Sequence, residues 1–170
     1  GFLAGLRFFT VYGPYGRPDM AVMSFSRSIA RNMMITLFLG PNNQTLSRDF
    51  TYIDDIVEGI VGSMMSAPPS RAKEATHRLF NLGNSQVVSV LDLVSQLEHI
   101  YKKQARKRYI LRPNLGEILL TNANVSAAYR AFKYSPKVNI AEGLHRFASW
   151  YTNFTTDVML VEDLLNYKPL

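Results

Sequence analysis

A short apolar stretch that runs straight into a loop rich in glycine and proline constrains this chain more than any other feature. Residues 6–11 are β-branched, aromatic or apolar with few exceptions, a composition typical of a buried strand. Residues 13–19 then carry two Gly and two Pro, which predicts a loop. Because open α/β sheets bind ligands where their strands end, this strand-to-loop junction is the first candidate for a site.

The predicted strand lies close to the start of a sequence that begins with Gly1 rather than Met. One such strand cannot bury both of its faces without neighbours on each side. We therefore expect an earlier part of the fold to be absent from this sequence.

Short strands and helices alternate along the rest of the chain, and this alternation predicts an α/β fold. We expect further strands at residues 35–39, 48–53, 78–82 and 107–111, and helices at residues 21–31, 54–67, 89–101, 124–132, 140–151 and 158–165. Ser89 is interpreted as a helix cap. Asp54 and Asp55 are interpreted as capping residues as well, since adjacent helical residues do not face each other as an acid–base pair would.

The composition narrows the classes of function. The hydrophobic content of 47% is typical of a globular protein, and the absence of Cys excludes disulfides and thiol chemistry in this segment. We expect no metal site, and no membrane span, because no apolar run approaches roughly 18 residues. The net charge of +6 is concentrated in a basic run at residues 102–108, which is interpreted as a solvated helix end, so we expect no nucleic-acid partner.

Three segments carry a resemblance to a known family. Residues 5–20, GLRFFTVYGPYGRPDM, resemble the segment that follows the catalytic Tyr and Lys of UDP-glucuronate 4-epimerases, which belong to the NAD-dependent epimerase/dehydratase family. Residues 47–59 and 80–85 resemble the next two signatures of that family, in the same order. Weaker similarity continues to about residue 152.

The resemblance implies a fold and a division of the chain. Residues 1–152 are expected to form the C-terminal, substrate-binding part of an extended short-chain dehydrogenase/reductase (SDR) Rossmann fold. This part would comprise the last parallel strands and a small mixed α/β subdomain. Residues 153–170 are expected to form a helical tail.

The resemblance also implies roles for named residues. Phe8 and Phe9 would lie near the nicotinamide of NAD, and Thr10 would face the hexose and help to hold its carboxylate. Arg17 and Arg48 would hold the nucleotide and the diphosphate, because a planar guanidinium can pair with two anionic oxygens at once. For Arg48, the alternative is an ion pair at a strand end with Asp49 or Asp54.

Arg112 and Glu117 fall where relatives carry a diphosphate-binding arginine and a ribose-binding aspartate. The match is imperfect, because this sequence has extra residues before Gly116 and a longer carboxylate side chain at Glu117. A plain surface loop is an equally open interpretation. Tyr129 and Lys133 reproduce the spacing of a Tyr-x-x-x-Lys pair, but they lie on the wrong side of the loop signature, so we expect no catalytic residue in this chain.

The activity that the resemblance implies is the interconversion of UDP-glucuronate and UDP-galacturonate at C4, through a 4-keto intermediate, with bound NAD. The Gly-rich NAD loop and the Tyr-x-x-x-Lys pair are expected upstream, so the fragment alone is expected to be inactive. The alternatives are a UDP-galactose 4-epimerase, a dehydratase, a UDP-xylose synthase, or an inactive binding module on the same fold. The full-length protein is expected to be a homodimer, either cytoplasmic or held at the Golgi membrane by an upstream anchor.

Overall fold

Strands and helices alternate along the chain, as the sequence predicts. The computed structural model describes residues 2–40, 43–67, 76–111 and 118–165. The elements are β1 (Phe2–Phe8), β2 (Thr10–Tyr12), α1 (Ala21–Ala30), β3 (Met34–Leu39), β4 (Ser47–Tyr52), α2 (Ile53–Met65), β5 (Thr76–Leu82), β6 (Val87–Ser89), α3 (Val90–Tyr101), β7 (Arg106–Leu111), α4 (Ser126–Phe132) and α5 (Ile140–Leu165). The α/β prediction is confirmed.

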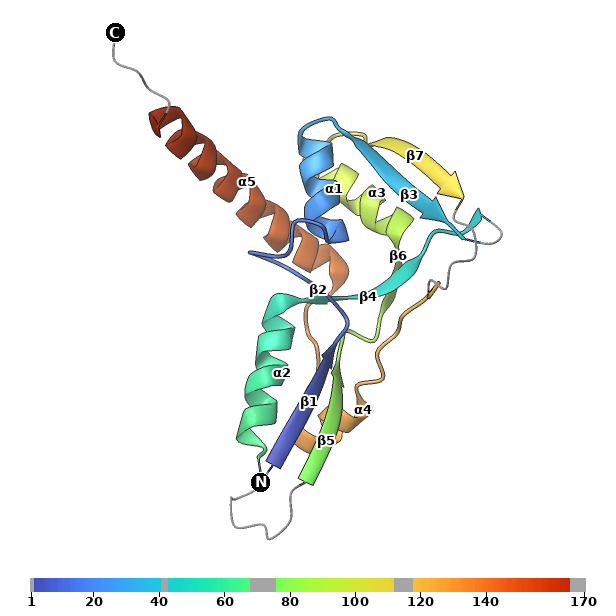
Figure 1. Cartoon of the computed structure of the whole chain (residues 1–170), viewed down its shortest axis with the longest axis vertical. Coiled ribbons are helices and arrows are strands. Elements are labelled where there is room, and N and C mark those ends of the chain that lie inside the picture. Colours follow the sequence, from blue (N-terminus) through green and yellow to red (C-terminus); the bar gives the residue numbers. More distant parts are fainter. Residues whose placement is uncertain (1, 41–42, 68–75, 112–117, 166–170) are drawn as a thin grey trace.

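Small, mainly parallel sheets are spaced along the molecule (Figure 1). β1 pairs in parallel with β5, and β3 pairs in parallel with β7. Between them, β4 pairs in parallel with β2 and antiparallel with β6. In Figure 1, α2 and α4 flank β1 and β5 at one end, whereas α1 and α3 lie with β3 and β7 at the other.

The strand predicted at residues 6–11 is two strands in the structure. β1 begins earlier, at Phe2, and ends at Phe8, and β2 begins at Thr10. At the break, the Phe9 N–H still donates to the Leu82 carbonyl oxygen (3.1 Å), while the Val11 N–H donates back to Phe9 (3.0 Å). The chain thus leaves β5 at Phe9 and joins β4, a change of partner that hydrophobic periodicity does not reveal.

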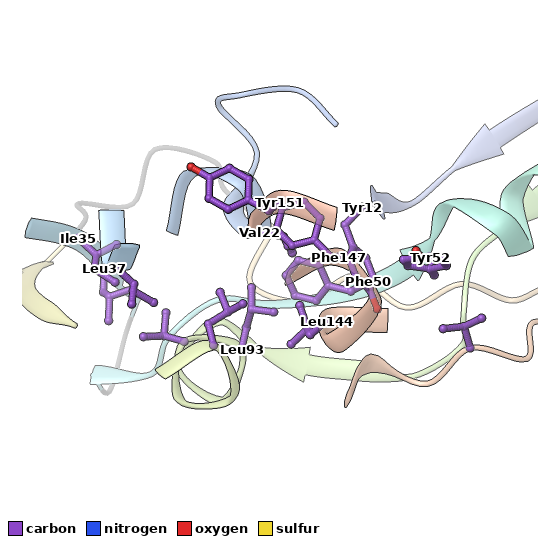
Figure 2. Close-up of a cluster of buried hydrophobic side chains, with 14 residues drawn as sticks. Tyr12, Val22, Ile35, Leu37, Phe50, Tyr52, Leu93, Leu144, Phe147 and Tyr151 are labelled. Atoms are coloured by element: carbon purple, nitrogen blue, oxygen red, sulfur yellow. The ribbon is translucent and has the colours of Figure 1, made fainter. Parts of the chain in front are cut away.

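The larger hydrophobic cluster lies between α1, α3, α5 and the strands β3 and β4 (Figure 2). Phe50 and Phe147 are each 1% exposed, and Leu93 and Leu144 are completely buried. Each such side chain contributes roughly 1.5–3 kcal/mol by leaving water. This cluster fixes α5 against the strand that carries Arg48.

The smaller hydrophobic cluster lies beneath β1 and β5. Ile56 from α2 and Ala128 from α4 pack with Phe80 and Leu82 of β5, and Tyr134 completes the group. The Tyr134 hydroxyl donates to the Gly83 carbonyl oxygen (3.0 Å), just beyond the end of β5. The two clusters together position the ends of β1, β4 and β5 relative to one another.

The last helix is continuous where the sequence predicts two. α5 runs from Ile140 to Leu165 and extends away from the rest of the molecule in Figure 1. The Thr152 and Thr155 hydroxyls donate to carbonyl oxygens one turn earlier on the helix (2.9 Å each). No Gly or Pro interrupts residues 152–157, so nothing ends the helix there. Among the described helices, none has both the length and the apolar character required to cross a membrane.

The capping role expected for Asp55 is wrong. Asp55 is 3% exposed, and its carboxylate accepts the backbone N–H groups of Lys137 (2.9 Å) and Val138 (3.1 Å). α2 begins after Tyr52 without a side-chain cap, and Asp54 points outward, 3.4 Å from Arg146. The segment at Lys137, 82 residues further along the chain, packs against the first turn of α2. The Asp55 carboxylate therefore accepts N–H groups from this segment instead of those of its own helix.

Candidate functional site

The carboxyl ends of β1 and β5 meet at one point, which the register places at Phe8 beside Leu82. Just beyond them lies Gly83, which is buried in a close contact. A Cβ atom on Gly83 would overlap Ala123 Cβ and would lie 3.1 Å from Asp49 Oδ2 and 3.3 Å from Phe9 Cδ2. Only glycine fits between these groups, so β1, β4, β5 and the segment at residue 123 converge here.

Asp49 is the buried centre of this convergence. Its carboxylate is 0% exposed and accepts backbone N–H groups from Asn84 (2.7 Å), Ser85 (2.9 Å) and Ala123 (2.9 Å). The Thr51 hydroxyl donates to the same carboxylate (3.1 Å). These donors offset the cost of burying a charge. Asp49 therefore ties β4 to the loop after β5 and to the segment before α4.

The residues expected near the nicotinamide and the hexose lie together at the junction of β1 and β2. Phe8 is 49% exposed, although it is a large apolar side chain at the end of a strand. Phe9 and Thr10 are half-buried, and Thr10 lies opposite Phe50 in the pairing of β2 with β4. The structure thus brings these three predicted residues to the carboxyl end of a parallel strand, where α/β folds bind ligands.

The loop at residues 13–20 presents Arg17 to solvent. It begins at Gly13, whose φ of 149° and close contact with Ile53 exclude a side chain. The Arg17 guanidinium donates to Asp19 through Nε (3.1 Å) and Nη2 (2.5 Å). This hydrogen bonding lowers the pKa of Asp19 and raises the pKa of Arg17, so the pair is fully charged at neutral pH. An incoming phosphate would compete with Asp19 for the same fork of donors.

A cavity of about 440 Å³ lies beside this loop. Its lining combines residues of α1 and β3 with residues that flank them: Asp19, Ala21, Ser24, Phe25, Ser28, Met34, Ile35, Thr36, Leu37, Phe38, Leu46 and Val90. The volume is within the range of small-molecule sites, roughly 300–1,000 Å³. A ring, several hydroxyls and one carboxylate suit a flat heterocycle with hydrogen-bonding groups. Asp19 joins the cavity to the Arg17 loop.

Arg48 is the second residue of β4 and follows Leu46, which lines the cavity, by two positions. Its Nη1 donates to the carbonyl oxygens of Ser47 (2.9 Å) and Leu119 (3.4 Å). Partial burial lowers the pKa of Arg48. Because Asp49 bonds backbone N–H groups and Asp54 faces Arg146, the ion-pair alternative for Arg48 is wrong.

Two predicted residues, Arg112 and Glu117, lie outside the described residues. The segment that follows them is described, and it approaches Arg48. The Ser47 N–H donates to the Leu119 carbonyl oxygen (2.9 Å), and Thr121 returns a hydrogen bond to Ser47 (3.2 Å).

The sequence interpretation missed three features of the site. Asp49 entered it only as a possible partner of Arg48, and the bonding between Asp19 and Arg17 was not foreseen. The cavity-lining face of α1, with Ser24 and Ser28, was also missed. A signal existed in α1, because serines one turn apart on an apolar helix mark a polar stripe. For Asp49, the backbone N–H groups that its carboxylate accepts lie 35, 36 and 74 residues away, so no local pattern predicts them.

The fold and these strand-end residues define a class of protein. Residues 2–83 match the model of the NAD dependent epimerase/dehydratase family. The parallel strands and flanking helices match solved structures of the extended SDR Rossmann type, as residues 5–20 predict.

Individual proteins and solved structures give a more specific comparison than the family model. UDP-glucuronate 4-epimerase 2 of Arabidopsis thaliana is 46% identical to this chain over 158 residues, which are 89% of the chain and 36% of the relative. The crystal structure of UDP-glucuronic acid 4-epimerase from Bacillus cereus, in complex with UDP-glucuronic acid and NAD, aligns with a TM-score of 0.72 and 34% identity, over 88% of this chain and 45% of that one. MoeE5 in complex with UDP-glucuronic acid and NAD aligns with a TM-score of 0.74 and 27% identity, over 89% and 47%. The chain spans less than half of each relative.

Proposed function

We propose that this chain is the nucleotide-sugar-binding part of an NAD-dependent UDP-glucuronate 4-epimerase, which interconverts UDP-glucuronate and UDP-galacturonate. The observation that carries the proposal is the adjacency of the Arg17 loop to the 440 Å³ cavity, with Asp19 common to both. The relatives' ligands support it, because the solved relative from Bacillus cereus holds UDP-glucuronic acid and NAD.

The nucleotide end of the substrate is assigned to the cavity and the two arginines. The Phe25 ring, with the hydroxyls of Ser24 and Ser28, provides apolar contact and hydrogen bonds for uracil. Arg17 and Arg48 supply the positive charge that a diphosphate requires, and the guanidinium geometry allows two hydrogen bonds from each. Arg112 and Glu117 stay assigned to the diphosphate and the ribose as predictions.

The sugar end is assigned to the junction of β1 and β2. NAD supplies hydride uptake and return at the sugar C4, and the exposed ring of Phe8 offers a face for its nicotinamide. The Thr10 hydroxyl can donate a hydrogen bond to the sugar carboxylate. The arginines hold UDP, and the sugar makes fewer contacts. The substrate therefore stays bound while the hexose rotates within the site.

The same proposal includes the division of the chain and the oligomeric state of the complete protein. Residues 1–152 form the substrate-binding portion of the epimerase/dehydratase domain, and residues 153–170 form a C-terminal tail. The complete protein pairs as a homodimer.

Thermal unfolding of the complete protein tests the proposal, with NAD present and UDP-glucuronate, UDP-galactose or UDP-glucose added in turn. A ligand that binds only the native state stabilises it, by about 2.7 kcal/mol at one hundred times its Kd. UDP-glucuronate should raise the melting temperature most. Thr10→Val, which removes one hydroxyl, should reduce that preference, whereas Thr156→Val on the exposed face of α5 should not. Equal shifts with all three sugars would contradict the substrate assignment, and no shift would contradict the enzyme assignment.

A further inference from the structure

The Arg17 loop rests against α5 through an aromatic cluster that includes none of the predicted site residues. The Tyr15 ring centroid lies 5.2 Å from that of Trp150 and 6.1 Å from that of Phe154, with both pairs edge-to-face. Trp150 and Phe154 are one helical turn apart and stack with centroids 5.0 Å apart. Tyr15, Trp150 and Phe154 together are called the aromatic clasp below.

The aromatic clasp is anchored in the hydrophobic core at one end and exposed at the other. Trp150 contacts Phe147, with centroids 5.7 Å apart, and Phe147 is 1% exposed at the centre of the cluster in Figure 2. By contrast, Tyr15 is 81% exposed and Phe154 is 40% exposed. The exposed rings contribute little to the core, so their arrangement calls for a separate reason.

The backbone at Tyr15 supplies that reason. Its φ of 58° is in the left-handed region, which a bulky residue adopts only when other contacts compensate. A β-turn accommodates this φ, because the Gly16 N–H donates to the Gly13 carbonyl oxygen (3.3 Å) and Pro14 precedes Tyr15. The contacts of the Tyr15 ring with α5 add to that turn. The loop is therefore held both by its own turn and by two aromatic residues of α5 that lie more than 130 positions further along the chain.

Tyr15 is close in sequence to the charged end of the loop. It lies two residues before Arg17 and four before Asp19, which lines the cavity. If the Tyr15 backbone relaxes, the Arg17 guanidinium and the cavity rim have to move with it.

We propose that the aromatic clasp holds the Arg17 loop in its binding geometry, so that Trp150 and Phe154 of α5 are positioning residues for uridine diphosphate. This inference rests on the proposed function. It assigns to α5 a role in ligand affinity in addition to its role in the hydrophobic core.

Calorimetric titration of the protein with UDP tests the inference. Phe154→Ala removes an exposed ring without opening the core, and we expect it to weaken UDP binding about threefold to tenfold, the equivalent of one lost aromatic pair. Thr156→Ala, two residues further along α5, is the matched control and should bind as the wild type does. Tyr15→Ala should weaken binding to a similar degree, and Tyr15→Phe, which keeps the ring, should recover most of that loss. Combined with Phe154→Ala, Tyr15→Ala should add little, because both changes open the same contact.

Fluorescence supplies a reading that a purely structural role would not change. Trp150 is the only Trp of residues 1–170. The difference in emission between the wild type and Trp150→Phe therefore isolates its signal in the complete protein. UDP should shift the Trp150 emission of the wild type, and this shift should disappear in Tyr15→Ala at an unchanged melting temperature.

The outcomes separate the two proposals. If the wild type binds UDP and Phe154→Ala binds it as tightly as Thr156→Ala does, the clasp inference is overturned and the proposed function stands. If the wild type does not bind UDP, the proposed function fails, and the inference that rests on it fails as well.

Discussion

At the scale of single residues, the Asp49 carboxylate connects more of the site than any predicted residue does. It accepts three backbone N–H groups from two segments other than its own strand. Hydrogen bonds to a buried charge contribute about 1.5–3 kcal/mol each. Replacing one carboxylate oxygen by an amide NH2 would place a hydrogen-bond donor opposite a backbone N–H, which is also a donor. The geometry of Gly83 and Phe9 therefore depends on this one side chain.

Asp49→Asn should lower the free energy of unfolding by about 3–5 kcal/mol, the usual cost of breaking a buried charged network. Asp54→Asn, an exposed acid five residues further on, is the matched control and should change it by less than about 0.5 kcal/mol. Urea unfolding followed by circular dichroism measures both. Equal midpoints for the two variants would show that Asp49 does not anchor the site.

Arg48→Lys keeps the positive charge but loses the planar fork of donors. We expect it to weaken UDP binding about tenfold, which corresponds to roughly 1.4 kcal/mol. Arg31→Lys, on an exposed residue at the end of α1, should have no effect on calorimetric titrations with UDP. Unchanged affinity in Arg48→Lys would remove Arg48 from the diphosphate site.

The candidate residues could be named from the sequence only where they stand within a local signature. Thr10, Arg17 and Arg48 each lie in a recognisable segment. The structure places Thr10 at the first residue of β2, Arg17 in the loop before α1 and Arg48 at the second residue of β4. Asp49 and Asp55 could not be interpreted in this way. Their partners come from distant segments, and a carboxylate in a strand or in the first turn of a helix looks the same with or without those partners.

At the scale of elements, local chemistry predicts the starts of helices better than the partners of strands. Ser89 does cap α3, because its hydroxyl accepts the Asp92 N–H (3.0 Å). The division of residues 6–11 into β1 and β2 was missed, since each strand is apolar and only its neighbour changes. The single long α5 was missed because its middle turns carry polar threonines, which read as a break between helices.

Ser89→Ala should lower the free energy of unfolding by about 1 kcal/mol, because it leaves a helical N–H without its acceptor. Ser95→Ala, at an exposed position in the same helix, should be neutral or slightly stabilising because alanine is the better helix former. Urea midpoints compare the two directly. A loss in Ser95→Ala equal to that in Ser89→Ala would argue against the cap.

At the scale of the whole molecule, two buried tyrosines connect stability with pH. Burial raises the pKa of Tyr12 and of Tyr134 above the ordinary value of 10.0. Above pH 10, the unfolded chain therefore releases protons that the native state retains. The stabilisation is complete below pH 10 and is lost as the pH rises beyond it, by at most about 1.4 kcal/mol per pH unit for Tyr12.

The melting temperature should therefore fall steeply between pH 10 and 11. Tyr12→Phe should flatten this fall, because phenylalanine cannot ionise in either state. A wild-type slope in Tyr12→Phe would mean that the buried hydroxyl is not the group that titrates.

The central claim concerns the reaction, and proton NMR of UDP-glucuronate incubated with the complete protein and NAD tests it most directly. We predict the appearance of UDP-galacturonate, with inversion at C4 alone and no net reduction of NAD. Formation of a pentose by loss of the carboxylate, or binding of UDP-glucuronate without any conversion, would contradict the epimerase assignment.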